Sequence, residues 1–183
     1  MNYRQLLKLI QPVECLYSLP WVAAAGLMPL VKGAYPPPSA WTWIWMVVAV
    51  VAGRTAAMSL NRLADVELDA KNPRTQERPL QKQLVTLKEV TALTITSVML
   101  FFFALFELPT LCWALAPFVA LLVLIYSYSK RFTIFCHFIL GSVFFFVPFL
   151  SWVAVTGTWS GAAAALGVAL GLSICANDLL YAI

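Results

Sequence analysis

A polar stretch at residues 54–80, RTAAMSLNRLADVELDAKNPRTQERPL, interrupts a chain that is otherwise strongly apolar. It runs from Arg54 to Leu80 and holds four of the eight acidic residues and five of the twelve basic residues. Apolar runs lie on both sides of it. We therefore expect the chemistry of the chain to lie in this stretch and the remaining segments to support it.

The composition predicts a membrane protein. Of the 183 residues, 62% are hydrophobic and 11% are charged, and the mean hydropathy is +0.84. Soluble domains are about 25% charged, so these values indicate several membrane-spanning segments. The net charge is +4, but no hydrophilic domain is large enough to contact many phosphates along a duplex, which excludes nucleic acid as a partner.

Six apolar runs are long enough to cross a bilayer as helices, which takes about 20 residues each. They cover residues 13–32, 41–60, 89–107, 109–129, 132–154 and 159–178. Residues 1–15 mix charged and apolar side chains, as an amphipathic helix at the membrane surface does. The connections are short except at residues 62–88. The predicted fold is all-α: a polytopic transmembrane bundle of about six helices, forming one domain over residues 1–183.

The distribution of charge predicts the orientation of this bundle. With a cytoplasmic N-terminus, ten of the twelve basic residues fall on the inner side, Lys32 lies outside and Arg54 lies within the bilayer. That asymmetry obeys the positive-inside rule. The same threading puts Asn177 and Asp178, at the end of the sixth run, on the inner side. We expect a multi-pass protein of the inner (cytoplasmic) membrane, with its N-terminus and polar site facing the cytoplasm.

Asn61, Asp65 and Asp69 follow one another at intervals of four residues. In one helix of 3.6 residues per turn, this spacing puts all three on one face over about 12 Å. Pro73 and Pro79 end that helix soon afterwards. The loop after it is basic, with Lys71, Arg74 and Arg78. Carboxylates one turn apart repel unless a cation lies between them, and oxygen ligands suit Mg²⁺ shared with a phosphate, so the pattern favours a Mg²⁺-diphosphate site over a merely solvated helix end.

Four further residues are candidates for the same site. Arg54 precedes Asn61 by two turns, on the same face and inside an apolar run where a charge is costly, so it is a candidate for an anionic substrate group or else a structural arginine. Lys130 and Arg131 end the fourth run on the side of the aspartates, where they suit diphosphate oxygens or serve only as topogenic charges. His137 is expected to be a hydrogen-bonded packing residue rather than a general base.

These motifs together resemble the UbiA superfamily of intramembrane aromatic prenyltransferases. The first aspartate-rich motif of that family looks like Asn61-x-x-x-Asp65-x-x-x-Asp69 followed by NPRTQERPL at residues 72–80. Arg54 and the segment YSYSKRFT at residues 126–133 are similar to its quinone-biosynthesis branch. The resemblance covers essentially the whole chain and implies nine transmembrane helices around a central cavity. Asn177-Asp178-x-x-Tyr181-Ala182 looks like the start of the second aspartate-rich motif, so we expect a chain truncated at its C-terminus relative to the family.

The resemblance also implies a reaction and a role for each site residue. Such enzymes use Mg²⁺ to transfer a polyprenyl group from its diphosphate to an aromatic acid such as 4-hydroxybenzoate, in ubiquinone or menaquinone biosynthesis. The Mg²⁺ ligands implied are Asn61, Asp65, Asp69 and Asp178. The groups implied to neutralise the diphosphate are Arg74, Arg78 and Lys130. Arg54 is implied to bind the carboxylate of the aromatic acid.

Other functions remain open from the sequence alone. The acceptor could be 1,4-dihydroxy-6-naphthoate, or the reaction could be the farnesylation of haem. A non-catalytic membrane scaffold or lipid-binding fragment is a different class, but it has no reason to keep Asn61, Asp65, Asp69 and Asp178 on one side of the bilayer. A transporter would need ionisable residues near mid-membrane on several spans, and only Arg54 and, marginally, His137 meet that condition.

Overall fold

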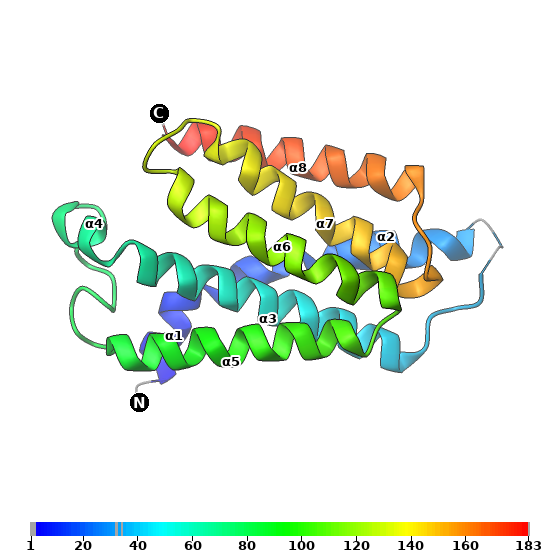
Figure 1. Ribbon diagram of the computed structural model, residues 1–183, viewed down its shortest axis with the longest axis horizontal. Coiled ribbons are helices and arrows are strands. Elements are labelled where there is room, and N and C mark those ends of the chain that lie inside the picture. The colour runs from blue at the N-terminus through cyan, green and yellow to red at the C-terminus, as the bar shows by residue number, and fades with distance from the viewer. Residues whose placement is uncertain (1–2, 32, 34, 183) are drawn as a thin grey trace.

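The long helices of the computed structural model run side by side along one axis (Figure 1). The structure describes residues 3–31, 33 and 35–182. In chain order its helices are α1 (Tyr3–Ile10), the 3₁₀ helix η1 (Pro12–Tyr17), α2 (Leu19–Val31), α3 (Ala40–Ala64), α4 (Val66–Lys71), α5 (Leu87–Phe106), α6 (Thr110–Ser129), α7 (Cys136–Thr156) and α8 (Gly161–Ala182). No strand occurs within these residues. The predicted all-α class is therefore confirmed.

Five of the described helices are long and apolar enough to cross a membrane, namely α3, α5, α6, α7 and α8. The first predicted span, residues 13–32, is only partly right because α2 covers 13 residues. Gln11 adopts a left-handed conformation with φ 48°, and Pro12 then starts a separate 3₁₀ helix. A bend of 44° lies between Arg4–Ile10 and Cys15–Val31, and counting these two segments as one broken span gives six. The chain is thus a multi-pass membrane protein.

Small side chains let the helices pack closely. A buried cluster between α2, α3, α5, α6 and α7 contains Val22, Met46, Ala104, Cys112 and Val153. A close approach joins α7 to α8, where a Cβ added at Gly141 would lie 2.6 Å from the carbonyl oxygen of Gly171. A Cβ added at Gly171 would lie equally close to the carbonyl oxygen of Gly141. Contacts between small residues of this kind are the usual basis of helix association in membranes, where burial of apolar surface gives little driving force.

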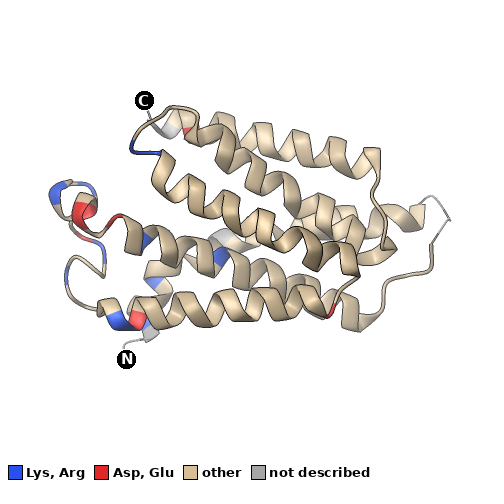
Figure 2. Cartoon of the chain, viewed as in Figure 1, with Lys and Arg blue, Asp and Glu red and all other residues tan. Residues whose placement is uncertain are grey.

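Most of the charged residues that the structure describes lie at one end of the bundle (Figure 2). That end holds α4, the connection from α4 to α5, the loop from α6 to α7 and the C-terminal end of α8 (Figure 1). Asp178, near the end of α8, therefore lies at the same end as Asp65 and Asp69, as the threading predicted. Lys32, expected on the opposite side, lies outside the described residues. Which compartment the charged end faces stays a prediction.

A small second core holds the α4–α5 connection in place. Leu6 and Leu9 of α1 pack with Leu80, Val85 and Val90. In the amphipathic lead-in predicted for residues 1–15, Leu6 and Leu9 are thus buried against protein, whereas Leu7 and Val13 are exposed.

Thr86→Ala is expected to loosen the start of α5. The Thr86 hydroxyl accepts a hydrogen bond from the Glu89 N–H (3.2 Å), and Glu89 Oε2 accepts one from the Thr86 N–H (2.8 Å), a complete capping box. Loss of such a cap costs about 1 kcal/mol of unfolding free energy. Unfolding by SDS in mixed micelles measures the effect. Thr96→Ala is the control and should unfold like the parent, because the exposed mid-helix hydroxyl of Thr96 donates to the Ala92 carbonyl of its own helix.

Candidate functional site

Asp65 lies at a break between two helices. α3 ends at Ala64 and α4 begins at Val66, with Asp65 at φ −97° and ψ 7°. The expectation of one uninterrupted helix is therefore wrong at this residue. Arg131, from the loop after α6, donates a hydrogen bond to the Ala64 carbonyl oxygen, which gives a partner to a carbonyl at the helix end.

The one-turn spacing of the three polar residues survives this break. The Asp65 N–H donates to the Asn61 carbonyl oxygen (3.1 Å), and the Asp69 N–H donates to the Asp65 carbonyl oxygen (2.8 Å). Asn61, Asp65 and Asp69 consequently keep the spacing from which the sequence argument started. α4 ends at Lys71, shortly before Pro73, as predicted.

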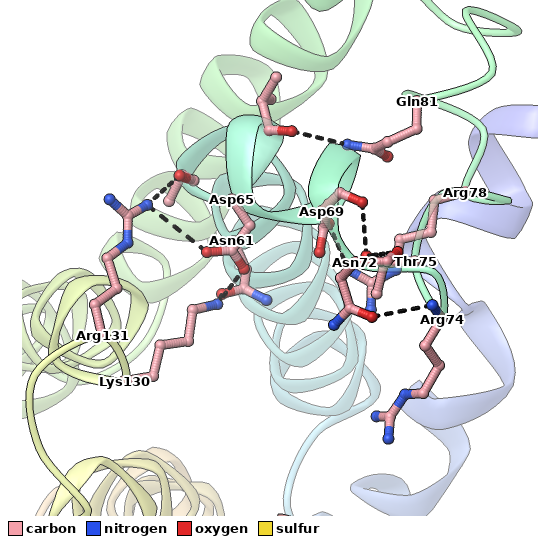
Figure 3. Close-up of polar contacts among 12 residues, drawn as sticks. Asn61, Asp65, Asp69, Asn72, Arg74, Thr75, Arg78, Gln81, Lys130 and Arg131 are labelled. Atoms are coloured by element: carbon pink, nitrogen blue, oxygen red, sulfur yellow. Dashed lines mark hydrogen bonds and ion pairs between the residues drawn. The ribbon is translucent and has the colours of Figure 1, made fainter.

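Asn61 and Asp65 share one cation. Lys130 Nζ donates to Asn61 Oδ1 and to Asp65 Oδ2 (Figure 3). Arg131 Nη2 lies 3.7 Å from the other carboxylate oxygen, Asp65 Oδ1. The Asp65 side chain is only 8% exposed, and its Oδ1 accepts no hydrogen bond from the described residues. A buried carboxylate oxygen in this condition is a ready ligand for a cation.

Asp69 has a different basic partner. Arg78 Nη1 donates to Asp69 Oδ2 (2.5 Å), and the Thr75 hydroxyl donates to the Asp69 carbonyl oxygen (2.8 Å). The Asn72 side chain accepts a hydrogen bond from the Arg74 N–H (3.0 Å). This local turn directs the Arg74 guanidinium away from Asp69 (Figure 3).

One open cleft of about 850 Å³ joins the two ion pairs. The predicted site residues that line it are Asn61, Asp65, Asp69, Arg78 and Lys130. It also takes in Arg62, which is buried, and Arg131. Arg62 was given no role from the sequence, although it directly follows Asn61, whereas Arg131 was considered together with Lys130 for the diphosphate oxygens. Three predicted residues, Arg54, Arg74 and Asp178, do not line this cleft.

Asp178 is held by a histidine on the neighbouring helix. His137 Nδ1 lies 2.7 Å from Asp178 Oδ2, joining the start of α7 to the end of α8. His137 is thus hydrogen-bonded, as expected, but to an assigned site residue.

The carboxylate and amide oxygens of these residues are the type of ligand that a hard divalent cation prefers, but they are spread over the cleft rather than gathered around one point. Within the described residues, no three Asp, Glu, His or Cys side chains converge on one point. The side-chain oxygens of Asn61 and Asp65 do lie close together, because the Lys130 ammonium contacts both. The four-ligand Mg²⁺ site stays a prediction.

Arg54 lies deeper in the bundle, two turns before Asn61 on α3. Its guanidinium carbon lies 5.4 Å from the ring centroid of Phe144 on α7, which is a cation–π contact. A cationic group beside an aromatic ring can orient an anionic aromatic molecule.

Comparison with known proteins identifies the family. The model of the UbiA prenyltransferase family matches residues 19–183. The chain belongs to the UbiA prenyltransferase family. A 4-hydroxybenzoate octaprenyltransferase of Vibrio cholerae is 28% identical over 98% of this UbiA-family chain and 62% of its own length. The corresponding protein of Shewanella piezotolerans is 31% identical over 92% of the chain and 55% of its own length.

Two solved structures share the fold of this UbiA-family chain. The apo structure of a UbiA homolog from Aeropyrum pernix K1 superposes with a TM-score of 0.81 at 30% identity, over 93% of the chain and 63% of that protein. A digeranylgeranylglyceryl phosphate synthase superposes equally well at 18% identity, over 98% of the chain and 62% of its own. The chain therefore spans about three fifths of the length of these relatives.

Proposed function

We propose that this UbiA-family chain takes part in the transfer of a polyprenyl group from polyprenyl diphosphate to an aromatic acid such as 4-hydroxybenzoate, in quinone biosynthesis. The observation that carries the proposal is the cleft in which Asp65 and Asp69 face Lys130 and Arg78. Carboxylates for a metal ion beside cations for a diphosphate are what such a substrate requires. The likeness to proteins named 4-hydroxybenzoate octaprenyltransferase supports the choice of acceptor.

The acidic side of the cleft would hold Mg²⁺. Asn61, Asp65 and Asp69 supply hard oxygen donors, and Asp65 Oδ1 accepts no hydrogen bond from the part of the chain that the structure describes. Asp178 is the fourth proposed ligand, from α8. Bound there, Mg²⁺ would neutralise negative charge on the diphosphate leaving group.

The basic side of the cleft would bind the diphosphate oxygens. Lys130, Arg78 and Arg131 all line it. When the carbon–oxygen bond of the allylic diphosphate breaks, the electron pair moves to the diphosphate. The hydrogen bonds from these three side chains would then become stronger, because the diphosphate oxygens gain negative charge. The ring carbon beside the acceptor's hydroxyl then forms the new carbon–carbon bond and loses its proton. The apolar helices next to the cleft would keep out water, which would otherwise trap the allylic cation.

Arg54→Met is expected to raise the KM for 4-hydroxybenzoate by about 10- to 100-fold, the usual range for a lost hydrogen-bonded charge pair. The KM for the prenyl diphosphate should change little. The matched control is the methyl ester of the acceptor, which has no carboxylate to pair with Arg54. If the variant weakened acid and ester equally, Arg54 would not be the carboxylate partner.

The proposed function is tested by prenyl transfer in membranes that contain this chain. Prenyl diphosphate and radiolabelled 4-hydroxybenzoate are supplied with Mg²⁺ or with EDTA. We expect a prenylated product that depends on Mg²⁺. Turnover should be unchanged in Glu77→Gln, because Glu77 is exposed and forms its ion pair with Lys82, away from the cleft. A prenylated product formed at the same rate in EDTA would contradict the metal-dependent reaction.

A further inference from the structure

The first helix, α1, lies at the level where two membrane spans end. Its buried leucines, Leu6 and Leu9, belong to one apolar cluster with Val90, in the first turn of α5. Leu63, in the last turn of α3, packs against the same cluster. Both α3 and α5 are long and apolar enough to cross a membrane. Figure 1 shows α1 beside the start of α5, at the charged end of the bundle. In a bilayer, α1 therefore lies at about the depth of the lipid headgroups.

The side of α1 that faces away from this cluster is basic. Arg4 and Lys8 lie one turn apart on the same side of the helix, and both are exposed. Leu7 lies next to them and is half exposed. Lys88, the second residue of α5, is exposed as well. Glu89, the acidic residue that follows it, is engaged in the capping box at the start of α5. The two helices thus present three basic side chains and an exposed leucine at the membrane surface.

This arrangement suits the surface of an anionic membrane. An amphipathic helix at headgroup depth binds through its exposed apolar side chains and through attraction of Lys and Arg to anionic lipids. We propose that α1 and the start of α5 form a binding surface for anionic phospholipid. Arg4, Lys8 and Lys88 contact headgroup phosphates, and Leu7 enters the boundary of the acyl chains. None of these residues lines the cleft, so the proposal does not depend on the proposed function.

A role in membrane orientation alone would not require this placement. The positive-inside rule counts basic residues on one side of the membrane, wherever they lie in the loops. Here Leu6 and Leu9 fix one face of α1 against the protein, so that Arg4 and Lys8 are held on the opposite side. Lipid bound to that side should stabilise α1 and, through the same leucines, the connection that ends at α5. Backbone amide exchange measures local stability of this kind.

The proposal predicts that anionic lipid protects α1. The purified full chain is placed in nanodiscs of phosphatidylcholine, with or without phosphatidylglycerol, and amide exchange is followed in the peptide that covers residues 3–10. Each basic residue near the surface contributes about fivefold to the affinity for anionic lipid. Phosphatidylglycerol should therefore slow exchange in α1 of the parent by at least about fivefold. The double variant Arg4→Gln, Lys8→Gln should lose most of this protection, and Lys88→Gln should lose part of it.

The matched control is the double variant Lys71→Gln, Lys82→Gln. It removes two exposed basic groups from the same end of the bundle, but from α4 and the connection, and should keep the protection. A salt concentration of about 0.5 M should abolish most of the protection in the parent, which tests the charge dependence without any substitution. Glycerol 3-phosphate added to phosphatidylcholine nanodiscs should not protect α1, because a free headgroup lacks the acyl chains that Leu7 contacts.

Three results would overturn the proposal. Equal exchange in the two kinds of nanodisc would show that these basic residues serve membrane orientation alone. Equal protection of the parent and of the Arg4→Gln, Lys8→Gln variant would show that lipid acts elsewhere on the chain. Protection by glycerol 3-phosphate equal to that by phosphatidylglycerol would show a site for free phosphate instead of a membrane surface.

Discussion

Asp65→Asn is expected to lower the rate of prenyl transfer by at least about 100-fold while the chain stays folded. Loss of one electrostatic contact to a charge that develops in the transition state typically has an effect of this size. Asparagine keeps the shape of the side chain and an oxygen, but it removes the charge that pairs with Lys130 and would hold the metal ion. Turnover in membranes, normalised to folded protein by size-exclusion chromatography in detergent, measures the loss.

Asp69→Asn should behave in the same way, since Asp69 is buried and pairs with Arg78 across the cleft. Glu77→Gln is the control for both, because it also removes a carboxylate from an ion pair near the site, but from one at the surface. Parent-like turnover in both aspartate variants would show that these carboxylates do not take part in the reaction.

The second large effect that we expect is a loss of stability when Gly141 or Gly171 is substituted. Gly141→Ala and Gly171→Ala each place a Cβ 2.6 Å from a backbone oxygen of the opposite helix, which cannot move aside as a flexible side chain could. Overpacking of this kind costs about 1–3 kcal/mol. Separation of α7 from α8 should also weaken the contact between His137, one turn before Gly141, and Asp178, two turns after Gly171.

SDS-induced unfolding measures this loss of stability, with Gly161→Ala as the control. A Cβ at Gly161, the first residue of α8, meets no atom within 4 Å. Unfolding of all three variants at the same SDS fraction would show that α7 and α8 are not in backbone contact.

Much of the fold follows from the apolar runs alone. Five runs became single helices because each is long, apolar and bounded by prolines, glycines or charges. The run at residues 13–32 did not, because Gln11 and Pro12 turn the backbone and start a separate 3₁₀ helix. The number of apolar residues in a run does not predict a local break of this kind in the helix.

The candidate site was predictable where it depends on spacing within the chain. The interval from Asn61 to Asp69 gave the acidic side of the cleft, since helical geometry needs no other segment. The break at Asp65 was not predictable, because Arg131, which contacts the Ala64 carbonyl, lies 67 residues further along the chain. The pairing of His137 with Asp178, 41 residues apart, likewise depends on how α7 meets α8.

Arg74 shows the limit of assigning residues by charge alone. It belongs to the same basic loop as Arg78, yet the turn at Asn72 directs its side chain away from Asp69. Whether Arg74 meets a diphosphate stays a prediction.

The central claim is that a divalent ion held at Asp65 and Asp69 touches the diphosphate in this cleft. Electron–nuclear double resonance tests it directly, with Mn²⁺ in place of Mg²⁺ and a non-hydrolysable prenyl diphosphate analogue, on nanodiscs washed free of unbound ligand. We predict a coupling between bound Mn²⁺ and ³¹P in the parent and in Glu77→Gln, and its loss in the double variant Asp65→Asn, Asp69→Asn. Bound Mn²⁺ without ³¹P coupling in the parent, or equal coupling in the double variant, would contradict the account.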